Sequence, residues 1–218
     1  MSGDTRQEVL DRVGATFCEF LEVALHTILF VRGVYPAELF ERKRKYNVPV
    51  HQSRHKDLNE YISNAVQDVR DWISRGGVEK VVLSIEEAST GKQLERFVFE
   101  VDIDLTGQPR PLAGASGCVV VAASEEALED GLRQALLKIS VADSLLRPLG
   151  TKDVTFSIYV HAPDSLDPSD HWEILAGEEQ RLDTGNAPGI GGGAAMVPLK
   201  HVRAGAFAMQ LYAHAPAS

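Results

Sequence analysis

One glycine run offers residue types that could bind a nucleotide cofactor. Residues 189–193 contain four glycines and loosely fit the dinucleotide-binding fingerprint, in which glycine backbone approaches a pyrophosphate. That fingerprint works where it joins a strand to a helix. Here Pro188 precedes the run, Pro198 follows it, and no helical pattern comes after. The sequence therefore favours a linker, and we expect no cofactor.

Histidine, aspartate and cysteine are the other candidates for chemistry. His51 and His55 are four residues apart, but no third ligand accompanies them, which favours surface histidines over a metal site. Asp102 and Asp104 have the spacing of a metal-binding pair, yet the alternation of a predicted strand accounts for both. Cys118 lacks the downstream arginine of a phosphate-handling thiolate loop and fits a small, partly buried residue.

Sequence motifs of enzymes are otherwise missing. The chain contains no Gly-x-Ser-x-Gly elbow and no phosphate-binding loop ending in Gly-Lys-Ser/Thr. We therefore expect no catalytic residue and favour a binding protein. An enzyme that uses the glycine run is the alternative from another class, and stabilisation by a nucleotide would reveal it.

Aromatic residues in polar surroundings are candidates for recognition. Tyr61 lies at the edge of an apolar helical stripe, and Trp172 stands between His171 and Glu173. Tyr212 belongs to the last apolar segment, where the alternation places it on the side opposite the apolar residues. Each fits either a half-buried aromatic residue or an anchor of the kind that dominates peptide interfaces.

Composition limits the class of protein. The 218 residues are 44% hydrophobic with a formal charge of −9, which suits one globular domain and disfavours direct nucleic acid binding. The most apolar stretch, residues 23–31, is too short to span a membrane. Two cysteines make no disulfide framework. The basic run at residues 42–45 fits either a nuclear import signal or a solvated loop.

Three helices follow from apolar periodicity. The first covers residues 9–31 and becomes apolar on nearly all sides, as a central helix does. The second begins near Ser53 and runs to Ile73. The third has Ser124 as its N-cap and ends before Pro148. Its predicted buried stripe is Leu128, Leu132, Leu136, Ile139 and Leu146.

Strands fill the remaining segments. Alternation or valine content predicts them at residues 78–85, 94–105, 154–160 and 207–212. In the predicted strand at residues 94–105, the side that carries Glu100 is expected to face water. In the last, Gln210 and Tyr212 project away from the buried side, while residues 106–117 and 183–193 are expected loops. The order of elements predicts an α+β domain, with helices on one face of a mostly antiparallel sheet.

Several blocks of sequence, in this order, resemble the HORMA domain family. They are Phe17-Cys18-Glu19-Phe20-Leu21-Glu22, Val34-Tyr35-Pro36, Lys45-Tyr46-Asn47-Val48-Pro49-Val50, Val78-Glu79-Lys80-Val81-Val82, Phe97-Val98-Phe99-Glu100, Leu137-Lys138-Ile139-Ser140-Val141 and Met209-Gln210-Leu211-Tyr212. Within the family, the chain is most similar to the branch that serves translesion DNA polymerase zeta as a small, non-catalytic accessory subunit. The agreement is near-continuous to about residue 160.

The resemblance implies a single HORMA domain over residues 1–218. Its core would cover about residues 9–150. The remainder, about residues 151–218, would form a safety belt, a C-terminal segment that closes over a short partner peptide. The peptide would add to the edge of the sheet, so that backbone hydrogen bonds give affinity and side-chain pockets give selectivity.

Roles for individual residues also follow from the resemblance alone. Tyr61, Trp172 and Tyr35 match positions that grip a proline-containing peptide of the catalytic subunit of DNA polymerase zeta. A second group matches positions that meet the C-terminal domain of a scaffold translesion polymerase: Met196, Gln210 and Tyr212. Arg133 matches a self-association surface, through which two HORMA domains pair.

The implied function is that of an adaptor in DNA damage tolerance. It would link the polymerase zeta catalytic subunit to the scaffold polymerase in the nucleus, with the cytoplasm as an alternative location, and would have no catalysis, metal, cofactor or membrane of its own. The alternative is a HORMA adaptor in cell-cycle checkpoint control or double-strand-break repair choice, which would bind another peptide in the same way.

Overall fold

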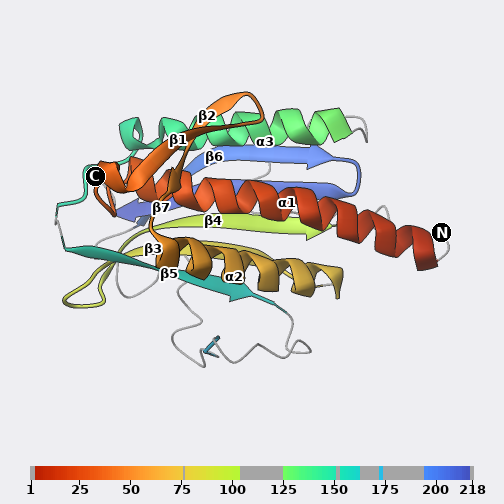
Figure 1. Cartoon of the computed structure of the whole chain (residues 1–218), viewed down its shortest axis with the longest axis horizontal. Coiled ribbons are helices and arrows are strands. Elements are labelled where there is room, and N and C mark those ends of the chain that lie inside the picture. The colour runs from red at the N-terminus through yellow and green to blue at the C-terminus, as the bar shows by residue number, and fades with distance from the viewer. Residues whose placement is uncertain are drawn as a thin grey trace.

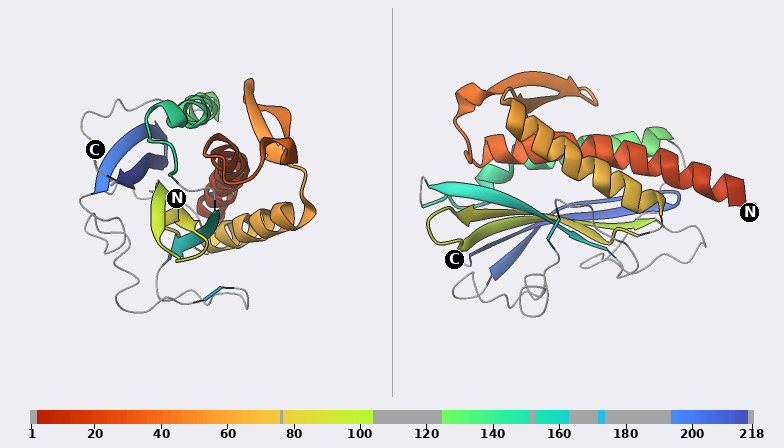
Figure 2. Two further views of the ribbon diagram at one scale, coloured as in Figure 1. Left: turned by 90° about the vertical axis from the view of Figure 1, so that its left-hand side faces the viewer. Right: turned by 60° about the horizontal axis from the view of Figure 1, so that its bottom comes forward.

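A sheet covered by helices on one face forms the fold (Figures 1 and 2). The computed structural model describes residues 3–75, 77–103, 125–150, 153–162, 172–173 and 194–216. The helices are α1 (Gly3–Val31), α2 (Lys56–Ser74) and α3 (Glu125–Ser140). The antiparallel sheet has the order β5-β3-β4-β7-β6. Its strands are β3 (Lys80–Glu87), β4 (Gln93–Ile103), β5 (Val154–His161), β6 (Ala194–Ala204) and β7 (Phe207–Pro216). The predicted α+β class is confirmed.

Helix α1 runs through the centre of the molecule, between α2 and α3 (Figure 1). Its segment Gln7–Val31 is apolar and long enough to cross a membrane, and 67% of its most apolar window is buried inside the fold. That degree of burial is what the central helix of a folded core shows. The prediction of a covered helix is confirmed, although the helix begins six residues earlier than expected.

Helices α2 and α3 bury the stripes that their periodicity predicts. In α2, Leu58, Ile62 and Ile73 are all buried, but the helix begins at Lys56 rather than Ser53 because a strand ends there. Helix α3 ends at Ser140, earlier than expected. Leu146 is still buried, beyond the short 3-10 helix η2 (Ala142–Ser144). The proposed N-cap Ser124 lies outside the described residues.

A hairpin of β1 (Phe40–Lys45) and β2 (Val48–Ser53) packs on α1 and corrects two expectations. The basic run at residues 42–45 is a strand and not a loop, because Val48 and Val50 on its partner are buried and hold it in place. His51 belongs to β2 and stacks on Phe30, with ring centroids 3.5 Å apart. It therefore shares no helical face with His55.

The outer face of the sheet, opposite the helices, is less exposed than predicted. Arg96, Val98 and Glu100 on β4 are all buried, although their side of the strand was expected to face water. Strand β4 lies in the middle of the sheet, between β3 and β7, so neighbouring side chains cover it. Strand β6 was not predicted at all, because Pro198 interrupts its pattern.

Candidate functional site

Strand β5 forms one end of the sheet and directs some of its backbone groups away from its only partner strand among the described residues. Ala88 N donates to Asp153 O at 3.0 Å, and Glu79 N donates to His161 O at 2.8 Å. Odd-numbered residues of β5 therefore direct their N–H and C=O groups toward β3, and even-numbered ones direct theirs away from it. Those even-numbered residues are Val154, Phe156, Ile158 and Val160, and the backbone of Ile158 already hydrogen-bonds with Tyr61. Within the described ranges, no strand pairs with this edge.

Two tyrosines and a phenylalanine gather beside this edge. The ring of Phe156 meets Tyr61 edge-on, with centroids 5.6 Å apart, and it meets Tyr35 in the same way at 6.2 Å. Tyr61 is 48% exposed although it touches this cluster. The structure thus brings together two of the predicted peptide-binding residues, and Phe156 joins them. An exposed aromatic surface beside unpaired backbone suits an extended peptide.

The electrostatic surroundings keep both tyrosines neutral. Burial raises the pKa of the Tyr61 phenol, a backbone hydrogen bond at Ile158 partly offsets this, and the nearby Glu86 raises it again. Burial also raises the pKa of Tyr35. Both phenols therefore stay protonated at neutral pH and can take part in hydrogen bonds without carrying charge.

Trp172, the third predicted peptide-binding residue, packs against α2. Its indole Nε1 donates to Asp68 Oδ2 at 2.7 Å, and its ring lies 5.2 Å from that of Trp72. Tyr61, Asp68 and Trp72 are spaced by seven and four residues, so they share one face of α2. The chain that leaves β5 therefore touches α2 before it reaches β6 at the opposite end of the sheet.

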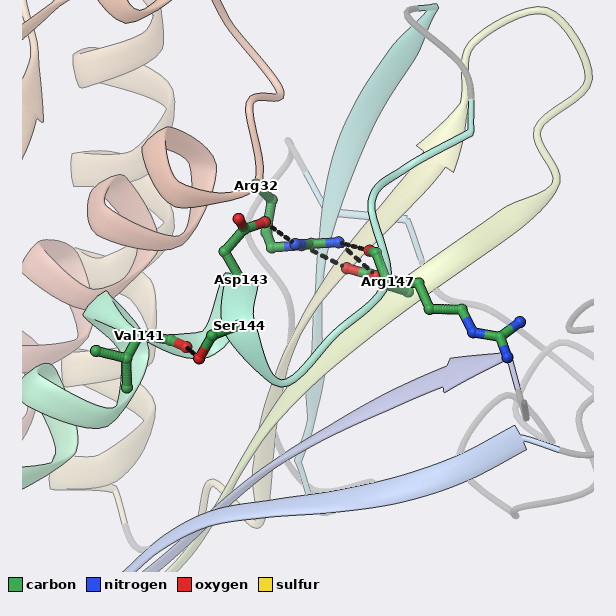
Figure 3. A network of polar contacts seen from close by, with 6 residues as sticks. Arg32, Val141, Asp143, Ser144 and Arg147 are labelled. Atoms are coloured by element: carbon green, nitrogen blue, oxygen red, sulfur yellow. Dashed lines mark hydrogen bonds and ion pairs between the residues drawn. The ribbon is translucent and has the colours of Figure 1, made fainter.

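A buried arginine holds the surroundings of this site together (Figure 3). Arg32 at the end of α1 donates to both carboxylate oxygens of Glu95 on β4, at 2.8 and 2.7 Å. It also donates to Asp143 Oδ1 and to the carbonyl of Arg147, each at 2.5 Å. Burial raises the pKa of Glu95, and Arg32 counteracts that effect. The network ties the segment before Tyr35 to the chain that leads into β5.

The predicted scaffold-polymerase residues share one face of the hairpin that β6 and β7 form. Met196 lies opposite His214, and Pro198 lies opposite Tyr212. Met196 is 45% exposed, but Gln210 and Tyr212 are only 5% and 3% exposed, so the expectation that both project into solvent is wrong. The face was predicted correctly. Their burial follows from the inner position of β7, where Tyr212 belongs to a small buried cluster with Val98 and Val82.

Arg133, the predicted self-association residue, lies on the exposed side of α3. Its guanidinium donates to Asp130 Oδ1 at 3.0 Å, and both side chains are about half exposed. Such a pair contributes little to stability because water solvates both charges. The side chain is therefore available to a partner.

The described residues contain no group of three or more side chains that could hold a metal ion. Cys18 is buried in α1, and burial raises the pKa of its thiol to about 12, which suits a packing role. The glycine run at residues 189–193, Asp104 and Cys118 lie outside the described residues.

Sequence reasoning did not select Phe156, Asp68 or Trp72 for this site. Phe156 was interpreted as one apolar position of a strand, which it is. Asp68 and Trp72 follow Tyr61 at helical spacing, and that spacing is the one signal that could have grouped them. Their contact with Trp172 joins distant parts of the chain, and no local pattern indicates it.

Comparison with known proteins identifies the family. The HORMA domain model matches residues 15–160. The mitotic spindle assembly checkpoint protein MAD2B of Danio rerio is 34% identical over 211 residues, which cover 92% of this chain and 89% of the relative. Human MAD2B is 39% identical over 155 residues, which cover 70% of this chain and 67% of the relative. The DNA polymerase zeta processivity subunit of Arabidopsis thaliana is 36% identical over 137 residues, covering 63% and 58%.

Solved structures show the same fold at lower identity. A chain of the mitotic checkpoint complex superposes with a TM-score of 0.74 and 22% identity, covering 94% of this chain and 99% of that one. HTP-2 of C. elegans, bound to a closure motif of HTP-3, has a TM-score of 0.73 and 15% identity, covering 96% and 88%. The resemblance seen in the sequence blocks is confirmed, and the chain belongs to the HORMA domain family.

Proposed function

We propose that this protein is a non-catalytic adaptor that binds an extended peptide along the open edge of β5. The observation that carries the proposal is the edge of β5, which pairs with no other described strand and lies beside the exposed Tyr61. A peptide strand would satisfy outward-facing backbone groups of β5, which gives affinity with little dependence on sequence. Tyr61, Tyr35 and Trp172 would add selectivity for apolar or proline side chains.

The peptide is proposed to come from the catalytic subunit of translesion DNA polymerase zeta. Support comes from a relative at 36% identity that is named as a processivity subunit of this polymerase. The adaptor would then act in the nucleus, in DNA damage tolerance. Its outer hairpin face at Met196 would meet the C-terminal domain of a scaffold polymerase, and Arg133 would serve self-association.

Titration calorimetry with a proline-containing peptide of the polymerase zeta catalytic subunit tests this proposal. Wild type should bind, and Tyr61→Ala should weaken binding by about 2 kcal/mol, or roughly 30-fold, because it removes an aromatic anchor. Trp172→Ala should weaken binding as well. Ser63→Ala is the matched control, since Ser63 is an exposed residue of the same helix that lies away from the face with Tyr61 and Asp68. A folded wild type that does not bind this peptide would contradict the proposed client.

A second candidate is an adaptor in cell-cycle checkpoint control or in the choice of double-strand-break repair. Relatives named as spindle assembly checkpoint proteins favour it, including human MAD2A at 28% identity. It uses the same edge of β5 with another peptide. Affinity capture from cell extract separates the two: recovery of checkpoint or break-repair proteins without polymerase zeta would favour this candidate.

A further inference from the structure

The two tryptophans of this chain lie against each other. The sequence contains Trp72 and Trp172 and no other tryptophan. Their ring centroids are 5.2 Å apart at an angle of 56°, although one belongs to α2 and the other to the chain between β5 and β6. Packing of this kind adds to the free energy of burial of both rings.

Trp172 contributes to the burial of Trp72 and also packs against the main hydrophobic core. Val69 and Ile73, the neighbours of Trp72 on α2, belong to the main hydrophobic core, whereas Trp72 does not. The Trp72 side chain is nonetheless only 7% exposed. Trp172 supplies part of the cover, so a large apolar ring on α2 depends on the chain that follows β5.

Asp68 fixes the orientation of Trp172. An indole N–H that leaves water needs a hydrogen-bond acceptor, and the carboxylate of Asp68 supplies one at 2.7 Å. Because the acceptor is charged, this bond is stronger than one between neutral groups. Asp68 and Trp72 are four residues apart on α2, so they hold the same indole at its polar and its apolar side.

We propose that Asp68 and Trp72 are positioning residues that anchor Trp172 to α2. The anchor holds Trp172 on the face of α2 that also carries Tyr61. This inference rests on the proposed function, because a peptide on β5 would lie next to Tyr61 and the anchored Trp172. The anchor then sets how fast a bound peptide leaves, and it has less effect on how fast the peptide arrives.

Circular dichroism tests the anchor without any peptide. Two tryptophans packed this closely give an exciton couplet in the far ultraviolet. Wild type should show it, whereas Trp72→Phe, which keeps an aromatic ring, should abolish it. Asp68→Ala should reduce the couplet strongly, and Asp71→Ala, which removes an exposed carboxylate of the same helix, should leave it intact. An absent couplet in wild type, or an unchanged one in Asp68→Ala, would overturn the anchor.

Release kinetics test the positioning role. A labelled peptide of the polymerase zeta catalytic subunit should leave Asp68→Ala about tenfold faster than wild type, with little change in association, because a charge-assisted hydrogen bond is lost. Asp68→Asn keeps an acceptor oxygen and should restore slow release. An unchanged release rate would overturn the positioning role. A wild-type couplet without peptide binding would establish the anchor and contradict the proposed client instead.

Discussion

The two ends of the sheet, at β6 and at β5, differ in how they are packed and in what they expose. At one end, β6 and β7 pair along their length, and β6 packs so closely on α3 that a Cβ at Gly131 would lie 2.4 Å from Val202 Cγ1. At the other end, β5 likewise has a single partner among the described strands, and the exposed Tyr61 lies beside it. An aromatic residue occurs at both ends, but Tyr212 is buried. What distinguishes the proposed binding edge is therefore an exposed aromatic residue beside the open strand.

The largest expected effect concerns the support of the β5 end. Arg32→Ala leaves Glu95 buried without its cation, and we expect a loss of about 4 kcal/mol in the free energy of unfolding. Denaturant unfolding measures it. The double variant Arg32→Met, Glu95→Leu should recover much of the loss, because it replaces the charges with apolar side chains.

An exposed pair serves as the control for that prediction. Arg133→Ala removes the half-exposed contact with Asp130 and should cost less than about 1 kcal/mol. Equal losses in Arg32→Ala and Arg133→Ala would contradict the role given to the buried network.

Acid should lower the free energy of unfolding of the whole domain, because His26 lies in α1, the central helix that covers the sheet. Burial, together with the nearby charge of Lys43, lowers the pKa of His26 from 6.5 to about 4. The unfolded chain therefore binds a proton below pH 6.5 while the folded protein stays neutral. The contribution of His26 to the free energy of unfolding is constant above pH 6.5. It falls by about 3 kcal/mol as the pH drops to 4.

Unfolding measured across this pH range tests the role of His26. His26→Leu should flatten much of the dependence because it removes the titrating group, and among the described residues neither ring nitrogen of His26 has a hydrogen-bond partner that the substitution would leave unpaired. A His26→Leu variant with the full wild-type pH dependence would assign the effect to other groups.

A smaller effect than that of Arg32→Ala is expected at the β6 end. Gly131→Ala places a methyl group against Val202, and the clash should outweigh the gain in helix propensity by about 1 kcal/mol. Thermal unfolding measures it, and adding Val202→Ala should relieve the clash. Gly150→Ala is the control, because its added Cβ meets nothing within 4 Å. A Gly131→Ala variant as stable as wild type would contradict the close packing of α3 on β6.

Local periodicity predicted the elements that carry strong patterns. The stripe of α2 and the alternation of β5 both appear in the structure, and together they place Tyr61 next to Phe156. The β1–β2 hairpin was missed because four adjacent basic residues hide its alternation. Its turn also uses Tyr46 and Asn47 at positive φ, in place of the usual glycine.

Strand order and distant contacts could not be predicted in this way. Alternation assigned Gln210 and Tyr212 to the correct face, but only the order of strands reveals that β7 is internal and that both are buried. The contact of Trp172 with Asp68 and Trp72 arises from tertiary structure. No spacing in the sequence brings those residues together.

Amide hydrogen exchange with and without the polymerase zeta peptide tests the central claim most directly. A strand added to β5 would hydrogen-bond the backbone groups that face away from β3. The amides of Phe156 and Val160 should therefore become protected when the peptide binds, while the outer edge of β6 stays unchanged. Protection at β6, or peptide binding without protection at Phe156 and Val160, would contradict the account.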